Sequence, residues 1–160
     1  MNFAIKPGYD RPEEVKELFI EYTDMLVKGE PAFEEYLGIQ NFDDELKHLE
    51  KKYGMPSGRL YLLYVNDELA GCVALRKMDK EKCELKRLYV KPRFRGEGLG
   101  DLLLERIIGD ARRIGYKYMY LDTLPFLERA IGMYKRCGFE EIQRYNDSPL
   151  DNTIFMRLAL

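Results

Sequence analysis

The chain has 160 residues, of which 46% are hydrophobic and 34% charged, and its formal net charge is −2. This length and composition predict one soluble globular domain, residues 1–160, with a single sizeable core. They argue against a membrane partner, because no apolar run approaches the ~20 residues needed to span a bilayer, and the small net charge argues against a nucleic-acid partner.

The first third of the chain predicts one strand followed by helices. Residues 2–6 form a short strand, and Pro12 at an early helical position starts a helix that runs to about Lys28. A second helical region follows the break at Gly29-Glu30-Pro31, and a third is expected over residues 43–51.

The rest of the chain predicts most of a sheet and two further helices. Asn66-Asp67 suits a hairpin turn, and Gly115 suits the end of a helix. The expected strands are 60–65, 68–78, 83–90, 116–121, 139–143 and 153–158, and the expected helices are 99–114 and 126–136. The fold class is therefore mixed α/β, with a mostly antiparallel, twisted sheet of about six or seven strands, one βαβ crossover and flanking helices.

A basic, glycine-rich turn separates a predicted strand from a strongly amphipathic predicted helix, and it reads Arg93-Phe94-Arg95-Gly96-Glu97-Gly98-Leu99-Gly100. Its glycines let the main chain approach a ligand closely, and its arginines are forked donors that match phosphate oxygens. The positive end of the helix dipole adds to this attraction. The turn therefore predicts a site for a phosphorylated ligand; the alternative is a plain connection between strand and helix.

The letters of this turn distinguish between phosphate-binding motifs. No GxxxxGK[ST] string occurs, and the dinucleotide motif GxGxxG does not match Gly96-x-Gly98-x-Gly100. The pattern [Arg/Gln]-x-x-Gly-x-[Gly/Ala] does match from Arg93 onward, and here the chain resembles the GNAT superfamily of acyl-CoA-dependent N-acyltransferases. Residues 84–92 are similar to that family's preceding strand, and residues 130–139 to its A-x-x-x-Y-x-x-x-G-F ending.

The resemblance implies the acyl-CoA N-acyltransferase fold and direct transfer of an acetyl group from acetyl-CoA to a primary amine in a ternary complex. The acceptor would be a small molecule, an amino acid or a peptide, and no metal is implied. The implied acetyl-CoA contacts are Leu88, Tyr89 and Val90 at the acetyl group and, at the pyrophosphate, Arg93, Arg95, Gly96, Glu97, Gly98, Leu99 and Gly100.

Two residues take catalytic roles by the same resemblance. Glu84 lies on the strand before the turn, where the family often places its base, acting directly or through a water; the alternative is a surface glutamate beside Lys82 and Lys86. Tyr134 lies four residues before Gly138, at the family's position for the acid that protonates the departing thiolate. The alternative for Tyr134 is an aromatic residue at the edge of the core.

Acceptor contacts are expected in the N-terminal half, which is similar to a group of small bacterial family members. Glu21, Tyr22, Gln40 and Asp43 are candidates, because an ammonium-bearing substrate requires hydrogen-bond acceptors and carboxylates. Asp122 and Thr123 end a predicted strand opposite the turn, and they either line the acceptor cleft or cap the next helix.

A basic stretch precedes and enters the turn, with five cationic and no acidic residues between Leu85 and Arg95: Lys86, Arg87, Lys91, Arg93 and Arg95. We interpret the cluster as a complement to the phosphates of coenzyme A, although Lys86 taken alone is typical of a solvated strand face. RNA binding is the alternative for a basic strand, but no RNA motif supports it.

Cysteine and histidine usage bears on metal sites and location. The three cysteines, Cys72, Cys83 and Cys137, are widely spaced and never in CxxC, which argues against a zinc site and for a reducing cytoplasm. The single histidine, His48, is expected on the surface.

Two other functions stay open, namely transfer of a longer acyl group and a non-catalytic CoA-binding sensor. Exposed apolar segments near the C-terminus would be compatible with a homodimer.

Overall fold

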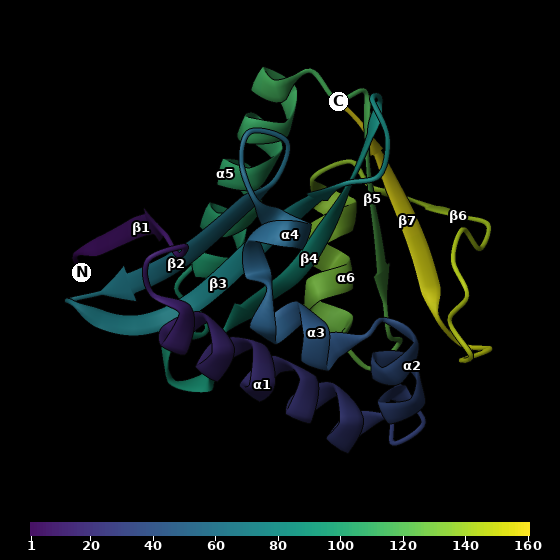
Figure 1. Ribbon diagram of the computed structural model, residues 1–160, viewed down its shortest axis with the longest axis horizontal. Coiled ribbons are helices and arrows are strands. Elements are labelled where there is room, and N and C mark those ends of the chain that lie inside the picture. The colour runs from purple at the N-terminus through teal and green to yellow at the C-terminus, as the bar shows by residue number, and fades with distance from the viewer.

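The computed structural model describes residues 1–160 as a seven-stranded sheet with helices on both faces (Figure 1). The order across the sheet is β1-β2-β3-β4-β5-β7-β6, and only β4 and β5 pair in parallel. The predicted mixed α/β class and mostly antiparallel sheet are therefore confirmed. The strands are β1 (Phe3–Pro7), β2 (Arg59–Val65), β3 (Glu68–Lys77), β4 (Lys82–Val90), β5 (Tyr118–Thr123), β6 (Glu140–Ile142) and β7 (Ile154–Ala159).

The helices divide between the two faces of the sheet (Figure 1). Helices α5 and α6 share one apolar cluster with the sheet, and α1 and α4 share another on the opposite face. None of the helices combines the length and apolar character that a membrane crossing demands. The helices are α1 (Pro12–Gly29), α2 (Phe33–Ile39), α3 (Phe42–Lys47), α4 (Leu49–Tyr53), α5 (Leu99–Ile114) and α6 (Glu128–Arg136), with a 3₁₀ turn at Pro92–Phe94.

Strand β2 shows why the sheet needs helices on both sides. Its residues 60–65 are all buried, as expected for a central strand with a continuous apolar run. Tyr61 and Leu63 belong to the cluster under α5, whereas Leu60 and Leu62 belong to the cluster under α1, because successive side chains point to opposite faces.

Strand β4 is bent by a bulge at its centre. Ala74 of β3 pairs with Lys86 and Cys72 pairs with Tyr89, so two residues of β4 oppose one residue of β3. Arg87, within the bulge, has a φ of 58°, in the left-handed region. The bulge changes the direction of β4 just before the glycine-rich turn.

Strands β4 and β5 pair over only a few residues and then diverge (Figure 1). The parallel register joins Lys82–Glu84 to Tyr118–Tyr120, and no β5 residue pairs with Leu85–Val90. The backbone edge of β4 beyond Glu84 therefore has no strand partner on this side. Helix α5 makes the crossover between the two strands, which places the glycine-rich turn at the open end.

Some element boundaries differ from those expected. The predicted helix 43–51 is divided at His48, whose φ of −135° lies outside the helical region, so that Glu45 and Leu49 contact different partners. Strand β5 begins two residues later than predicted, because the Tyr116 N–H still bonds to the Ala111 carbonyl at the end of α5. His48 is exposed, as predicted.

The apolar C-terminal segment is not exposed. Strand β7 lies between β5 and β6, and its side chains Phe155, Met156 and Leu158 are buried. The expectation of an exposed apolar segment there is wrong, because the alternating apolar residues of β7 complete the core instead of forming a surface.

Candidate active site

The glycine-rich turn has the backbone geometry of an anion-binding loop. Gly96 and Gly98 have φ of 89° and 74°, values that favour glycine, and a Cβ at either position would meet no atom within 4 Å. Gly98 is the N-cap of α5 and supplies no side-chain cap, so the N–H groups of the first turn remain available for a ligand.

A recess of about 310 Å³ lies beside this turn. Besides the turn backbone, it is lined by three arginines, Arg95, Arg129 and Arg136, and by one carboxylate, Asp101. Arg136 and Asp101 lie 3.9 Å apart, both largely exposed. An excess of guanidinium groups beside free helix N–H groups suits a pyrophosphate.

A second cavity, of about 420 Å³, continues from this recess, and the two share six lining residues, Val90, Arg95, Gly100, Arg129, Ala130 and Met133. Its walls come from α1, the end of β4 and α6. Most of the lining is apolar and includes Met25, Leu88, Tyr89, Phe126 and Met133. A narrow, mostly apolar cavity that opens onto a basic recess fits the pantetheine arm and the phosphates of acyl-CoA.

The hydroxyl of Tyr134 faces this second cavity. Tyr134 is 7% exposed, its ring packs edge-on against Phe139, and its hydroxyl makes no hydrogen bond to the protein. Burial raises the pKa of Tyr134 above its ordinary value. The phenol is therefore protonated near pH 7 and can donate its proton to a group in the cavity.

A third cavity, of about 30 Å³, adjoins the 420 Å³ cavity near the point where β4 and β5 cease to pair. It shares Tyr22 and Leu127 with the 420 Å³ cavity. Its polar lining groups come from α1, from α2 and the residue after it, from β4 and β5, and from the residue before β7, namely Tyr22, Tyr36, Gln40, Lys86, Arg87, Asp122, Thr123 and Thr153. The position at the end of the larger cavity suits an acceptor.

Asp122 is held in place at this acceptor end. Its Oδ2 accepts hydrogen bonds from the Tyr36 hydroxyl at 2.5 Å and from the Asn146 amide at 2.6 Å. No protein group bonds to its Oδ1. Asp122 is not a helix cap, because α6 begins only at Glu128 with Leu127 as its N-cap.

Glu84 lies in a different environment from the one expected. It is 3% exposed, and it does not line the three cavities described above. Its Oε1 accepts from Arg76 at 2.6 Å and its Oε2 accepts from Tyr145 at 2.6 Å. Burial would raise the pKa of Glu84, but Lys86 and Arg76 together outweigh burial and hold it below its ordinary value.

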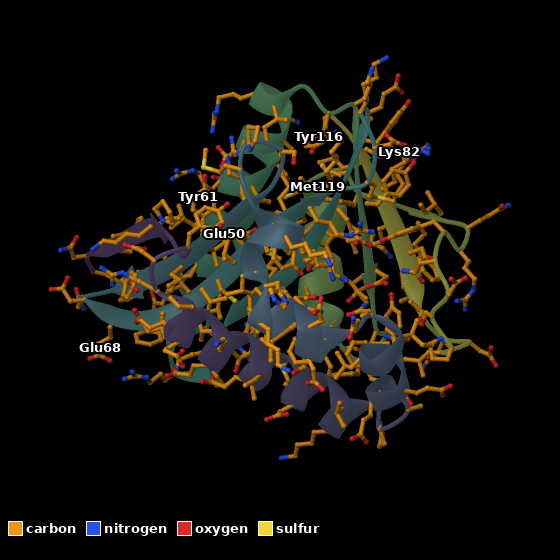
Figure 2. All side chains as sticks on the ribbon, in the orientation of Figure 1. Glu50, Tyr61, Glu68, Lys82, Tyr116 and Met119 are labelled. Carbon is orange, nitrogen blue, oxygen red and sulfur yellow. The ribbon has the colours of Figure 1, made fainter.

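Most of the predicted basic cluster does not face the phosphate recess. Arg93 extends to Glu68, 2.6 Å away, at the tip of the β2–β3 hairpin (Figure 2). Lys91 is paired with Glu17 and Glu21. Lys86 and Arg87 are buried on β4, so the interpretation of Lys86 as a solvated residue is wrong.

Of the five cationic residues, only Arg95 lines the recess, where its Nε also donates to the Val90 carbonyl. The other predicted acyl-CoA contacts that line the two cavities are Leu88, Tyr89, Val90, Gly96, Gly98, Leu99 and Gly100, whereas Arg93 and Glu97 line neither.

The predicted acceptor residues separate into two groups. Tyr22, Gln40, Asp122 and Thr123 meet in the small cavity, although they are far apart in the sequence. Glu21 and Asp43 do not line it. Glu21 bonds instead to Lys91 and Tyr89, and Asp43 is exposed in the first turn of α3.

Some lining residues were not foreseen. Arg129, Met133 and Arg136 face the turn from α6, and their spacing of four and three residues is the signal that could have found them. Tyr36 and Lys86, which line the small cavity, and Asn146, which bonds to Asp122, had no local signal, because the packing of distant segments brings them to the acceptor end.

Residues 15–139 match the Acetyltransferase (GNAT) family. The chain belongs to this family. The acetyltransferase is 42% identical to an uncharacterized N-acetyltransferase of Schizosaccharomyces pombe over 78% of this chain and 77% of that protein. A solved acetyltransferase structure from Streptococcus agalactiae shares its fold, with a TM-score of 0.79 at 23% identity over 99% and 98% of the two chains.

A second solved structure connects this fold with the co-substrate. It is a GNAT family acetyltransferase from Elizabethkingia anophelis with acetyl-CoA bound, similar at a TM-score of 0.65 and 24% identity over 99% of each chain. Family membership and these relatives establish the protein as an acyl-CoA-dependent acetyltransferase.

Proposed function

We propose that this acetyltransferase moves an acetyl group from acetyl-CoA to a primary amine by direct attack within a ternary complex. The observation that carries the proposal is the Tyr134 hydroxyl, which makes no protein hydrogen bond and belongs to a side chain lining the cavity that joins the phosphate recess to the acceptor end. Since no fully buried polar side-chain atom of the protein lacks a hydrogen-bond partner, this hydroxyl is accessible and free to donate its proton to a group in the cavity.

Direct attack is favoured because no nucleophilic cysteine or serine lines the three cavities. Cys72 and Cys83 are buried elsewhere, and burial raises the pKa of both thiols. The amine nitrogen would attack the acetyl carbonyl carbon, the carbon–sulfur bond would break, and the thiolate would take the proton of Tyr134. The proton that the amine loses balances the one that the thiol gains.

A carboxylate near the amine would assist its deprotonation. For an alkyl amine of pKa about 10.4 at pH 7, deprotonation costs roughly 4.6 kcal/mol. Asp122 is the carboxylate that lines the acceptor cavity, whereas Glu84 has both oxygens engaged by Arg76 and Tyr145. The geometry favours Asp122 for contact with the amine, and a base role for Glu84 would require relay through the Tyr145 hydroxyl or a water.

The pH profiles of two variants identify which carboxylate, Asp122 or Glu84, acts as the base. If Asp122 is the base, Asp122→Asn lowers kcat/KM and removes the acidic limb of its pH profile, whereas Glu84→Gln keeps that limb. If Glu84 is the base through a relay, the two variants show the reverse pattern.

Initial-velocity kinetics test direct attack. With acetyl-CoA and an amine both varied, double-reciprocal lines should intersect, because both substrates must bind before any product leaves. Parallel lines, together with an acetylated enzyme detected by mass spectrometry, would contradict the proposal. Replacing acetyl-CoA with octanoyl-CoA in the same assay tests the acyl group. We expect the longer chain to react poorly, because only about 30 Å³ is free beyond Tyr22.

A further inference from the structure

Lys86 is a largely buried cation that makes no hydrogen bond or close ion pair of its own. It is 7% exposed, yet its ammonium makes no hydrogen bond and no ion pair with the protein. Its side chain lines the 30 Å³ acceptor cavity. Since no fully buried polar side-chain atom of the protein lacks a hydrogen-bond partner, the Lys86 ammonium retains accessible surface, and an anionic ligand in the cavity can pair with it.

The neighbouring charges are already paired with one another. Glu45 binds Arg87 through two bonds of 2.9 Å and also binds Lys52 at 2.7 Å. On the same face of the sheet, Glu84 binds Arg76 at 2.6 Å. Four cations, Lys52, Arg76, Lys86 and Arg87, therefore share two carboxylates, and Lys86 is the cation that has no ion pair of its own.

One more carboxylate faces the same cavity. Asp122 lines it from β5, the strand beside β4, but its hydrogen bonds go to Tyr36 and Asn146 and none goes to Lys86. The cavity therefore presents a free ammonium on β4 and a free carboxylate oxygen on β5. A ligand with one negative and one positive group matches both walls.

We propose that the acceptor is an amino acid or a similar small amine with a free carboxylate, and that Lys86 binds this carboxylate. The inference rests on the proposed function of the same site. A cavity needs about 10–15 Å³ to hold one water, so the 30 Å³ present match the two oxygens of a carboxylate. Gln40 lines the same cavity, where its carbonyl oxygen accepts from Arg87 at 2.9 Å.

The way in which the 30 Å³ and 420 Å³ cavities meet determines how such an acceptor would lie. The small cavity meets the 420 Å³ cavity at Tyr22 and Leu127, and Tyr134 lines the latter. With its carboxylate on Lys86, the acceptor has its amine beside Asp122 and directed toward the acetyl group. Lys86 is thus a specificity-determining residue that acts on the acceptor and leaves acyl-CoA binding to the glycine-rich turn.

The test compares amino acids with their carboxamides as acceptors in a thiol-release assay with acetyl-CoA. The wild type should acetylate at least one free amino acid with a kcat/KM about tenfold or more above that of its carboxamide. In Lys86→Met, kcat/KM for that amino acid should fall by about 10- to 100-fold, while the value for the carboxamide stays within about threefold and acetyl-CoA affinity is unchanged. Lys86→Arg should retain part of the preference for the carboxylate.

Lys82→Met is the matched control, because Lys82 lies on the same strand at its far end, outside the three cavities (Figure 2). It should leave the preference unchanged. Lys86→Met removes one of the two cations that favour the ionised form of Glu84, but Arg76 still pairs with that carboxylate at 2.6 Å, so the variant should remain folded. A thermal melt verifies this before kinetics.

Three results would overturn the inference. They are a wild type that prefers carboxamides, a Lys86→Met variant that loses activity equally on both acceptors, and a Lys86→Met variant that keeps the preference. Release with carboxamides or simple amines alone would contradict this inference and leave the transferase proposal standing. Absence of release with every amine would contradict both.

Discussion

Removal of the Tyr134 hydroxyl tests the proposed acid without disturbing the fold. Tyr134→Phe keeps the ring that packs against Phe139 and deletes an oxygen that has no protein hydrogen bond. The free energy of unfolding should therefore change by less than about 1 kcal/mol, because no bonded partner is left unsatisfied. Since a positioned acid accelerates a reaction by roughly 10²- to 10⁴-fold at most sites, we expect kcat to fall by about 10- to 10³-fold. That loss corresponds to about 1.4–4 kcal/mol of barrier.

The assay is thiol release at saturating acetyl-CoA and acceptor, with acetyl-CoA affinity measured in parallel by calorimetry. Tyr116→Phe is the matched control, because the Tyr116 hydroxyl donates to the Ser57 carbonyl at 2.7 Å, outside the three cavities. This control should lose about 1 kcal/mol of stability and keep its kcat. A Tyr134→Phe variant with wild-type kcat would refute the role of Tyr134, and so would one that loses only acetyl-CoA affinity.

Further predictions concern the recess and the buried ion pair beneath β4. Arg95→Glu should weaken acetyl-CoA binding more than tenfold by calorimetry, whereas Arg93→Glu, which lies off both cavities, should change it less than threefold. Glu45→Gln should destabilise the fold by about 3–5 kcal/mol in urea melts, because it leaves the Arg87 guanidinium, whose side chain is 2% exposed, without its carboxylate. Asp43→Asn, at an exposed position of α3, should stay within about 0.5 kcal/mol, and equal melts for the two variants would contradict this account. Burial raises the pKa of Glu45, but Arg87 and Lys52 outweigh burial and lower it from 4.5 to about 2. The Glu45–Arg87 pair therefore stabilises the fold above pH 4.5, and this contribution, up to about 3 kcal/mol, is lost as the pH falls toward 2. Acid melts in which Glu45→Gln shows the same pH dependence as the wild type would be inconsistent with this prediction.

The phosphate recess was largely predictable from the sequence, because its determinants are local. Three glycines, a basic turn and the amphipathic helix that follows lie within one segment, and the structure keeps them together at the N-terminus of α5. The exceptions are Arg93 and Glu97, which face away from the recess because the turn presents its backbone, and only some of its side chains, to the cavity.

The acceptor end was predictable only in part, because long-range packing determines it. The residues on either side of Glu84 suggested a surface position, but the β3–β4 register places Arg76 opposite it, and the carboxylate is buried against the half-buried guanidinium. Lys86 is buried for the same reason, since helices from the N-terminal half cover this face of β4. A single sequence carries no local signal for either event. The charge imbalance around Lys86 became apparent only once the partners of each carboxylate were known.

The central claim is tested most directly by thiol release from acetyl-CoA, measured with and without a panel of amines, free amino acids and short peptides. The account predicts slow release with acetyl-CoA alone, release that depends on an amine-bearing acceptor, and recovery of that acceptor in N-acetylated form by mass spectrometry. Tight acetyl-CoA binding with no acceptor-dependent release across the panel would contradict it.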